Sequence, residues 1–109
     1  MTEVAAWRQA LDQFAAQMRA LYEDRLQEVI LYGSRARGDA QDDSDVDTLI
    51  VLKPLGDFWV ELSRISEVAN RVSLDHDVVI SAIPVDAAKL SQPTTPLLLI
   101  TQREGIRVA

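Results

Sequence analysis

Apolar residues in this chain follow two different repeats in turn, and that alternation limits the folds open to it. Between residues 3 and 22 they recur every three or four positions, which predicts one face of a helix; these positions are Val4, Trp7, Leu11, Phe14, Met18 and Leu21. Residues 26–32 and 46–52 are instead short apolar runs typical of strands. The second run ends in continuous apolar residues, which is typical of a central strand covered on both faces.

The rest of the chain continues the alternation of helices and strands. Asp57 is placed to cap a helix over 58–72, and a strand over 77–83 is expected to end at Pro84. Residues 84–95 look like a loop with a helical turn at 86–90. Pro96 and Gly105 then mark the start and end of a last helix through about Arg103, and Thr2 is placed to cap the first one. With 109 residues the chain predicts one domain, 1–109, of the α/β class, in which helices flank a small mixed β-sheet.

Composition excludes several classes of protein. There is no cysteine and one histidine, His76, so neither a disulfide framework nor a cysteine- or multi-histidine-ligated metal site is possible. The net charge of −6 counts against direct nucleic-acid binding. Apolar runs are too short for a membrane span and no signal-peptide pattern is present, so we expect a cytoplasmic protein without a membrane partner.

Residues 33–47 contain the candidate ligand-binding and catalytic residues. Gly33-Ser34 follows directly on a predicted strand and precedes a predicted short helix. A glycine allows a ligand to approach the backbone closely, helix N-terminal amides attract anions, and a serine hydroxyl adds a donor. The pair therefore predicts a phosphate-binding turn, although a Gly-Ser pair taken alone is more often a plain turn.

Asp45 and Asp47 strengthen this interpretation. Residues two apart in a strand point to the same side, so these carboxylates would repel each other unless a cation lies between them. Magnesium prefers such hard oxygen ligands and often combines one or two carboxylates with substrate phosphates. The alternative is an exposed, solvated strand start, but apolar Leu49 and Val51 share the face, which favours the edge of a core.

A third carboxylate is expected from a neighbouring strand if two metal ions are to be held. Asp77 is our first choice because the apolar run Val78-Val79-Ile80 follows it directly, which would place it at the start of the strand. Asp75, two residues earlier, is the competing choice.

Taken together, these residues resemble the polymerase-β nucleotidyltransferase superfamily. That family carries Gly-Ser, about ten residues, then Asp-X-Asp; here residues 35–44 separate Ser34 from Asp45. The longer string Gly-Ser-X-Ala-Arg-Gly through Ser-Asp-X-Asp, and the ending from Pro96 to Ile106, resemble its minimal members. The resemblance implies a polymerase-β-like palm. It also implies ATP bound through Gly33, Ser34, Arg35 and Ser44, and two magnesium ions and catalysis through Asp45, Asp47 and Asp77.

The resemblance also implies a partner. Minimal members are typically paired with a HEPN-domain protein, an RNA-cleaving toxin, and can transfer AMP from ATP to one of its tyrosines. We therefore expect an antitoxin enzyme with a HEPN toxin as partner. A non-catalytic antitoxin that blocks the toxin by contact is the main alternative. Transfer to an antibiotic or an RNA end is less favoured, because the chain is short and acidic.

Overall fold

The computed structural model of the chain describes residues 5–109. Its elements follow in the order α1 (Ala6–Tyr22), a 3₁₀ turn η1 (Glu23–Arg25), β1 (Leu26–Tyr32), α2 (Ser34–Arg37), β2 (Val46–Leu52), α3 (Phe58–His76), β3 (Ile80–Asp86), α4 (Ala87–Ser91), α5 (Pro96–Glu104) and β4 (Ile106–Arg107). The expected cap Thr2 and stripe residue Val4 lie outside the described residues. Among residues 5–109, no helix combines the length and the apolar character that a membrane span requires.

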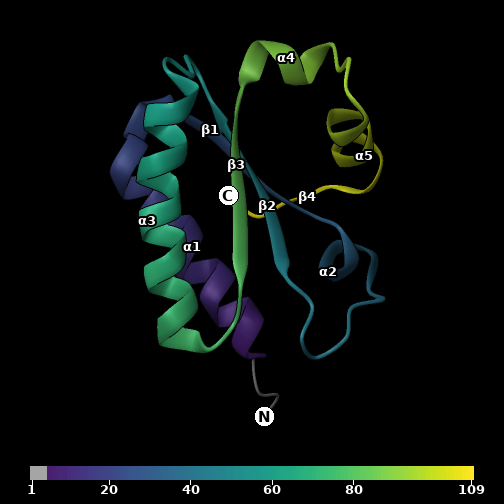
Figure 1. Cartoon of the computed structure of the whole chain (residues 1–109). Helices are drawn as coiled ribbons and strands as arrows, with labels where there is room; N and C mark the ends of the chain where they lie inside the picture. The colour runs from purple at the N-terminus through teal and green to yellow at the C-terminus, as the bar shows by residue number, and fades with distance from the viewer. Residues whose placement is uncertain (1–4) are drawn as a thin grey trace.

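The four strands form one mixed sheet, as the sequence predicted. Their order is β3-β2-β1-β4; β2 and β3 run parallel, while β1 is antiparallel to both of its neighbours. The parallel pair needs a crossover connection, and α3 supplies it. In Figure 1, α1 and α3 cover one face of the sheet, while α4 and α5 lie on the other. The ends of β1 and the starts of β2 and β3 therefore share one end of the sheet.

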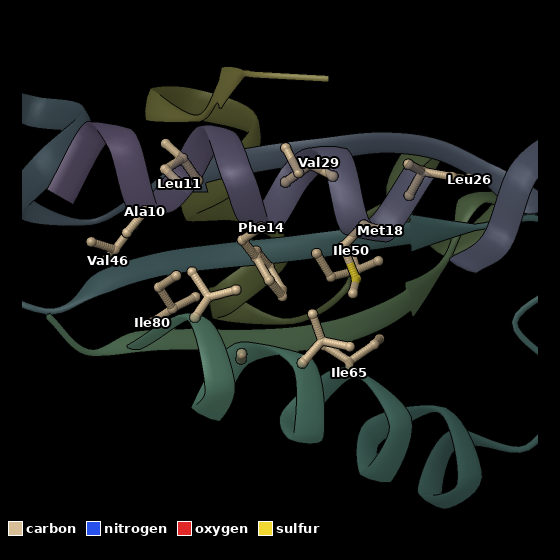
Figure 2. Close-up of a cluster of buried hydrophobic side chains, with 14 of the residues drawn as sticks. Ala10, Leu11, Phe14, Met18, Leu26, Val29, Val46, Ile50, Ile65 and Ile80 are labelled. Carbon is tan, nitrogen blue, oxygen red and sulfur yellow. The ribbon is translucent and has the colours of Figure 1, made fainter. Parts of the chain in front are cut away.

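Strand β2 is apolar from Leu49 to Leu52, where both of its faces are covered. Val46, Ile50 and Leu52 belong to the core beneath α1 and α3, whereas Leu49 and Val51 belong to a smaller cluster beneath α4 and α5. Figure 2 shows Phe14 and Met18 of α1 gathered with Ile50 of β2 and Ile65 of α3 in this core. The expected central strand is thus confirmed.

The third strand begins three residues later than expected. Helix α3 continues to His76, and Asp77 ends it with a left-handed backbone (φ 52°, ψ 43°), so β3 starts only at Ile80. Pro84 lies inside this strand, not at its end, because β3 is an edge strand and one side of it needs no N–H donor. The prediction of a strand over 77–83 was wrong in its boundaries. The expected turn at 86–90 is α4, and Gly105 follows α5 as expected.

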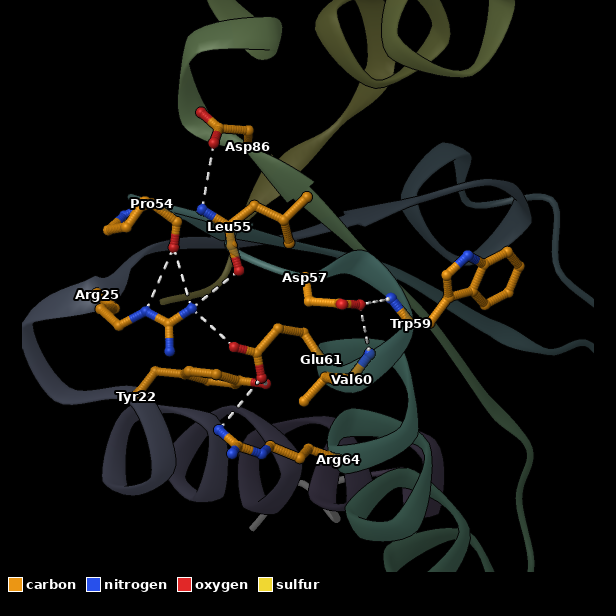
Figure 3. A network of polar contacts seen from close by, with 10 residues as sticks. All are labelled: Tyr22, Arg25, Pro54, Leu55, Asp57, Trp59, Val60, Glu61, Arg64 and Asp86. Atoms are coloured by element: carbon orange, nitrogen blue, oxygen red, sulfur yellow. Dashed lines mark hydrogen bonds and ion pairs between the residues drawn. The ribbon is translucent and has the colours of Figure 1, made fainter.

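A polar network closes the opposite end of the sheet (Figure 3). The buried carboxylate of Glu61 accepts hydrogen bonds from the Tyr22 hydroxyl (3.1 Å) and from Arg25 Nη2 (2.7 Å). Arg25 also donates to the main-chain carbonyls of Pro54 and Leu55, so it ties the start of β1 to the loop before α3. Burial, followed by the charge and hydrogen bond of Glu61, raises the pKa of Tyr22 to about 12.

Candidate functional site

Gly33 brings the Gly-Ser turn into contact with the acidic pair. It connects β1 to α2 with φ 76° and ψ −157°, a backbone conformation that is open almost only to glycine. A Cβ atom at this position would lie 2.5 Å from Oδ2 of Asp47. The Asp47 carboxylate therefore occupies space that a side chain at position 33 would need. The turn and the carboxylate pair form one site.

Asp47 lies in the middle of a row that crosses the sheet. Its register partners are Tyr32 on β1 and Ser81 on β3. The three share the face of Leu49, under α4 and α5, because residues two apart on a strand point the same way. Burial raises the pKa of Asp47, the charge of Asp45 raises it further, and Arg37 lowers it. Burial and the charge of Asp47 likewise raise the pKa of Tyr32. The row of Tyr32, Asp47 and Ser81 would therefore be stabilised by a nearby positive charge.

The carboxylate pair fits a magnesium ion whose other ligands come from a substrate. Asp45 is exposed just before β2, Asp47 is half-buried, and the charge of Asp45 raises the pKa of Asp47. Among residues 5–109, no group of three or more His, Cys, Asp or Glu side chains gathers closely enough to hold a metal ion. Magnesium commonly binds one or two carboxylates together with phosphate oxygens and water. Asp45 and Asp47, beside the Gly33-Ser34 turn where phosphate binding is expected, could supply the two carboxylates.

The structure removes the reason for choosing Asp77 as a third carboxylate. Asp77 is not at the start of a strand but after the last turn of α3, and Asp75 lies within that helix. The strand position beside Asp47 belongs to Ser81. Asp77 instead lines a groove with Asp42 and Asp43, outside the row on the sheet. The strand placement failed because nothing between Ser73 and His76 stops a helix.

Arg35 and Ser44, expected to bind the nucleotide, hold the acidic loop in this structure. Nη2 of Arg35 donates to the main-chain oxygens of Asp42 (3.4 Å) and Ser44 (3.3 Å), and its guanidinium lies 5.2 Å from the ring centre of Trp7. The Ser44 hydroxyl accepts a hydrogen bond from the Gln41 amide at 2.8 Å. Within the described part of the chain, no hydrogen bond occupies the Ser34 hydroxyl, which leaves it open to a ligand.

Glu104 is a residue at the site that sequence analysis missed. Its Oε1 atom accepts hydrogen bonds from the Gly33 amide (3.3 Å) and from Nη1 of Arg37 (3.0 Å). The C-terminal end of α5 thus supports the turn from 71 residues away in sequence. No local pattern signals such a contact, because it depends on how α5 folds back over the sheet.

Comparisons with known proteins found relatives in sequence and in fold. A protein of Methanocaldococcus jannaschii that is named as a protein adenylyltransferase is 40% identical over 73 residues, which are 67% of this chain and 73% of the relative. A crystal structure of a toxin–antitoxin complex with AMP-PNP has a TM-score of 0.62 at 18% identity, over 90% of this chain and 72% of its own. A complex of a tri-AMPylated Shewanella oneidensis HEPN toxin with its MNT antitoxin has a TM-score of 0.59 at 14% identity, over 94% and 71%.

The two solved structures share the fold of this chain, including its mixed sheet with flanking helices. The identity to the adenylyltransferase relative is high enough to indicate common descent. Residues 11–94, which include the whole turn and both carboxylates, match the nucleotidyltransferase domain family. This chain therefore belongs to the nucleotidyltransferase domain family.

Proposed function

We propose that this nucleotidyltransferase transfers AMP from ATP to a tyrosine hydroxyl of a partner protein, a HEPN-domain toxin, and so acts as its antitoxin in the cytoplasm. Two observations on relatives support the acceptor: one relative is named as a protein adenylyltransferase, and one structural neighbour is an AMPylated HEPN toxin with its antitoxin. A neighbour crystallised with AMP-PNP supports ATP as the donor.

The observation that carries the proposal is the contact between the Gly33 turn and Asp47. A phosphate held at this turn lies beside the carboxylates that would share its magnesium ions. Gly33, Ser34 and Arg37 offer a backbone approach, a hydroxyl and a positive charge, while Asp45 and Asp47 offer the metal ligands. Arg35 and Ser44 support this arrangement by fixing the loop that leads to Asp45.

The chemistry is a substitution at the α-phosphorus of ATP. The acceptor oxygen forms a bond to phosphorus, the bond to the β-phosphate oxygen breaks, and pyrophosphate leaves with that electron pair. The acceptor proton passes to a base. Magnesium bound by Asp45 and Asp47 would supply positive charge to the phosphates. The turn orients the triphosphate, and positioning is the protein's main contribution to such a reaction.

One observation favours the second candidate, an antitoxin that acts by contact alone. Ser81 stands at the strand position beside Asp47, so the carboxylate that could take up the acceptor proton there is missing. In the catalytic version of the proposal, the base comes from the acceptor protein or from solvent. In the contact version, the toxin is silenced without transfer.

Intact mass spectrometry of a HEPN-domain protein incubated with this chain, ATP and magnesium tests the proposal. Transfer adds about 329 Da per AMP. We expect the addition with wild type and none with the double variant Asp45→Asn/Asp47→Asn. Silencing of the toxin without added mass would favour the contact antitoxin.

The same double variant tests the metal assignment independently of any acceptor. We expect it to lose magnesium-dependent ATP binding in calorimetry because both expected ligands lose their charge. The fold should be retained or slightly stabilised, because two repelling carboxylates are removed. Magnesium-dependent ATP affinity equal to that of wild type would show that the ion binds elsewhere.

A further inference from the structure

A groove of about 390 Å³ lies beside the site, between the acidic loop and the junction of α3 with β3. Apolar side chains and carboxylates form most of its lining: Leu74, Val78, Val79, Asp42, Asp43 and Asp77. Leu74 is 84% exposed and Val79 is 57% exposed. Large apolar side chains this exposed, with a polar rim around them, are typical of a docking surface.

The charge of the groove has one sign. In the part of the chain that the structure describes, none of the carboxylates of Asp42, Asp43 and Asp77 forms an ion pair. Arg35, which is bonded to the same loop, donates to the main-chain oxygens of Asp42 and Ser44 and not to these side chains. The lining includes no Lys or Arg. An occupant of the groove should therefore carry positive charge.

The groove adjoins the site directly. The main-chain oxygen of Val79, in the groove lining, accepts a hydrogen bond from the amide of Val46 at 2.8 Å. Val46 lies between Asp45 and Asp47, and Ser81, two residues after Val79, is the register partner of Asp47. A segment bound in the groove is thus next to the point where an acceptor hydroxyl must arrive.

We propose that this groove binds a basic segment of the acceptor protein, with Lys or Arg among the three carboxylates and an apolar side chain on Leu74 and Val79. The proposal rests on the proposed function, since it names how the acceptor of that reaction is held. A second copy of this chain is disfavoured as the occupant because each copy carries a net charge of −6. A nucleic acid would meet three carboxylates and no cation.

Two matched tyrosine peptides test the proposal with the full chain. One carries Arg and Leu around the tyrosine, and in the other Glu replaces each Arg. Fluorescence polarisation without ATP measures docking alone, and the KM of each peptide as AMP acceptor measures docking during transfer. We expect the basic peptide to bind at least about tenfold more tightly and to have the lower KM.

Variants locate the binding. Asp77→Lys and Leu74→Ser should each weaken the basic peptide about tenfold while the Kd of ATP stays unchanged. Asp24→Lys, the same charge reversal on an exposed residue at the far end of the sheet, should leave peptide binding within about twofold, since surface charges this distant are screened.

The outcomes separate docking from transfer. The groove proposal would be overturned if both peptides bound equally well or if the basic peptide did not bind at millimolar concentration. It would also be overturned if Asp24→Lys weakened binding of the basic peptide as much as Asp77→Lys. A dimer in sedimentation that Leu74→Ser dissociates would overturn it too. Transfer to both peptides with equal KM would also overturn the groove but keep the proposed function. Selective binding of the basic peptide that depends on Leu74 and Asp77 would support the groove proposal. If such binding occurred without transfer of AMP, only the proposed function would be overturned.

Discussion

At the scale of single residues, the space left by Gly33 decides where Asp47 can lie. A side chain at Gly33 faces two separate obstacles, the strained backbone and the Asp47 carboxylate at 2.5 Å. Gly38, at the end of α2, has a similar positive φ of 83°, but no atom lies within 4 Å of the point that a Cβ atom would occupy there. Substitutions at the two glycines can therefore be compared to separate the free-energy cost of the backbone conformation from that of displacing a carboxylate.

We expect Gly33→Ala to lower the free energy of unfolding by about 1–3 kcal/mol, because of its unusual backbone conformation, and to weaken magnesium-dependent ATP binding. Gly38→Ala should cost stability without that loss of binding. Thermal denaturation and calorimetry on both variants measure the two effects. If both variants bound ATP equally well, the turn would not be part of the nucleotide site.

Ser81 offers a gain-of-function experiment at the same scale. Ser81→Asp would place a third carboxylate beside Asp47, which should cost the metal-free protein about 0.2–1 kcal/mol through like-charge repulsion. Magnesium should then stabilise the variant more than it stabilises wild type, because three carboxylates bind a hard cation better than two.

The measurement is the melting temperature of Ser81→Asp with and without magnesium, with Ser81→Asn as the uncharged control of similar size. An identical magnesium response in the Asp and Asn variants would mean that position 81 does not face the ion.

At the scale of elements, α1 and α3 are joined by the hydrogen bond from the Tyr22 hydroxyl to the carboxylate of Glu61. The hydroxyl of Tyr22 keeps its proton in the folded protein up to a pKa of about 12, whereas the unfolded chain releases it near 10. A pKa raised by folding stabilises the protein below the unfolded value, and this stabilisation is lost as the pH rises through the folded value. Stability should therefore fall between pH 10 and 12.

Tyr22→Phe should make that alkaline decline shallower. It should also lower stability at pH 7 by about 1–2 kcal/mol, since a hydrogen bond to the buried Glu61 carboxylate is lost. Urea denaturation at a series of pH values from 7 to 11 measures both effects, with Tyr32→Phe as the control at pH 7, since it retains the Tyr22–Glu61 hydrogen bond. An equally steep decline in Tyr22→Phe and wild type would assign the alkaline loss to other groups.

The same elements show what the sequence could predict. Strands β1 and β2 were placed correctly because each is a short apolar run bounded by polar or turn residues. That Asp45 and Asp47 point to the same side stays a prediction from the Asp-X-Asp spacing, because Asp45 lies just before β2. The boundary of β3 was misplaced because α3 ends at Asp77 without Gly or Pro, so no local signal marks the end. The contacts of Glu104 and the position of Ser81 depend on tertiary register, which single-sequence patterns do not contain.

At the scale of the whole molecule, the two ends of the sheet have different electrostatic character. The end with Glu61 balances its buried charge with Arg25 and Arg64. The other end has Asp45, Asp47 and the groove carboxylates without ion pairs among residues 5–109. A bound cation or basic partner should therefore stabilise the protein mainly at this second end, because it reduces the repulsion between the carboxylates.

The position of β2 between β1 and β3, with both faces covered, has a consequence for hydrogen exchange. Its amides should exchange only through global opening, whereas those of the exposed loop before it should exchange through local fluctuations. Mass-spectrometric exchange should show ATP and magnesium slowing deuterium uptake over residues 33–45, with little change over 48–52. We expect Asp45 to belong to the fast-exchanging segment and Asp47 to the slow one. The two proposed ligands of one ion would then be held by parts of the chain that open on different timescales.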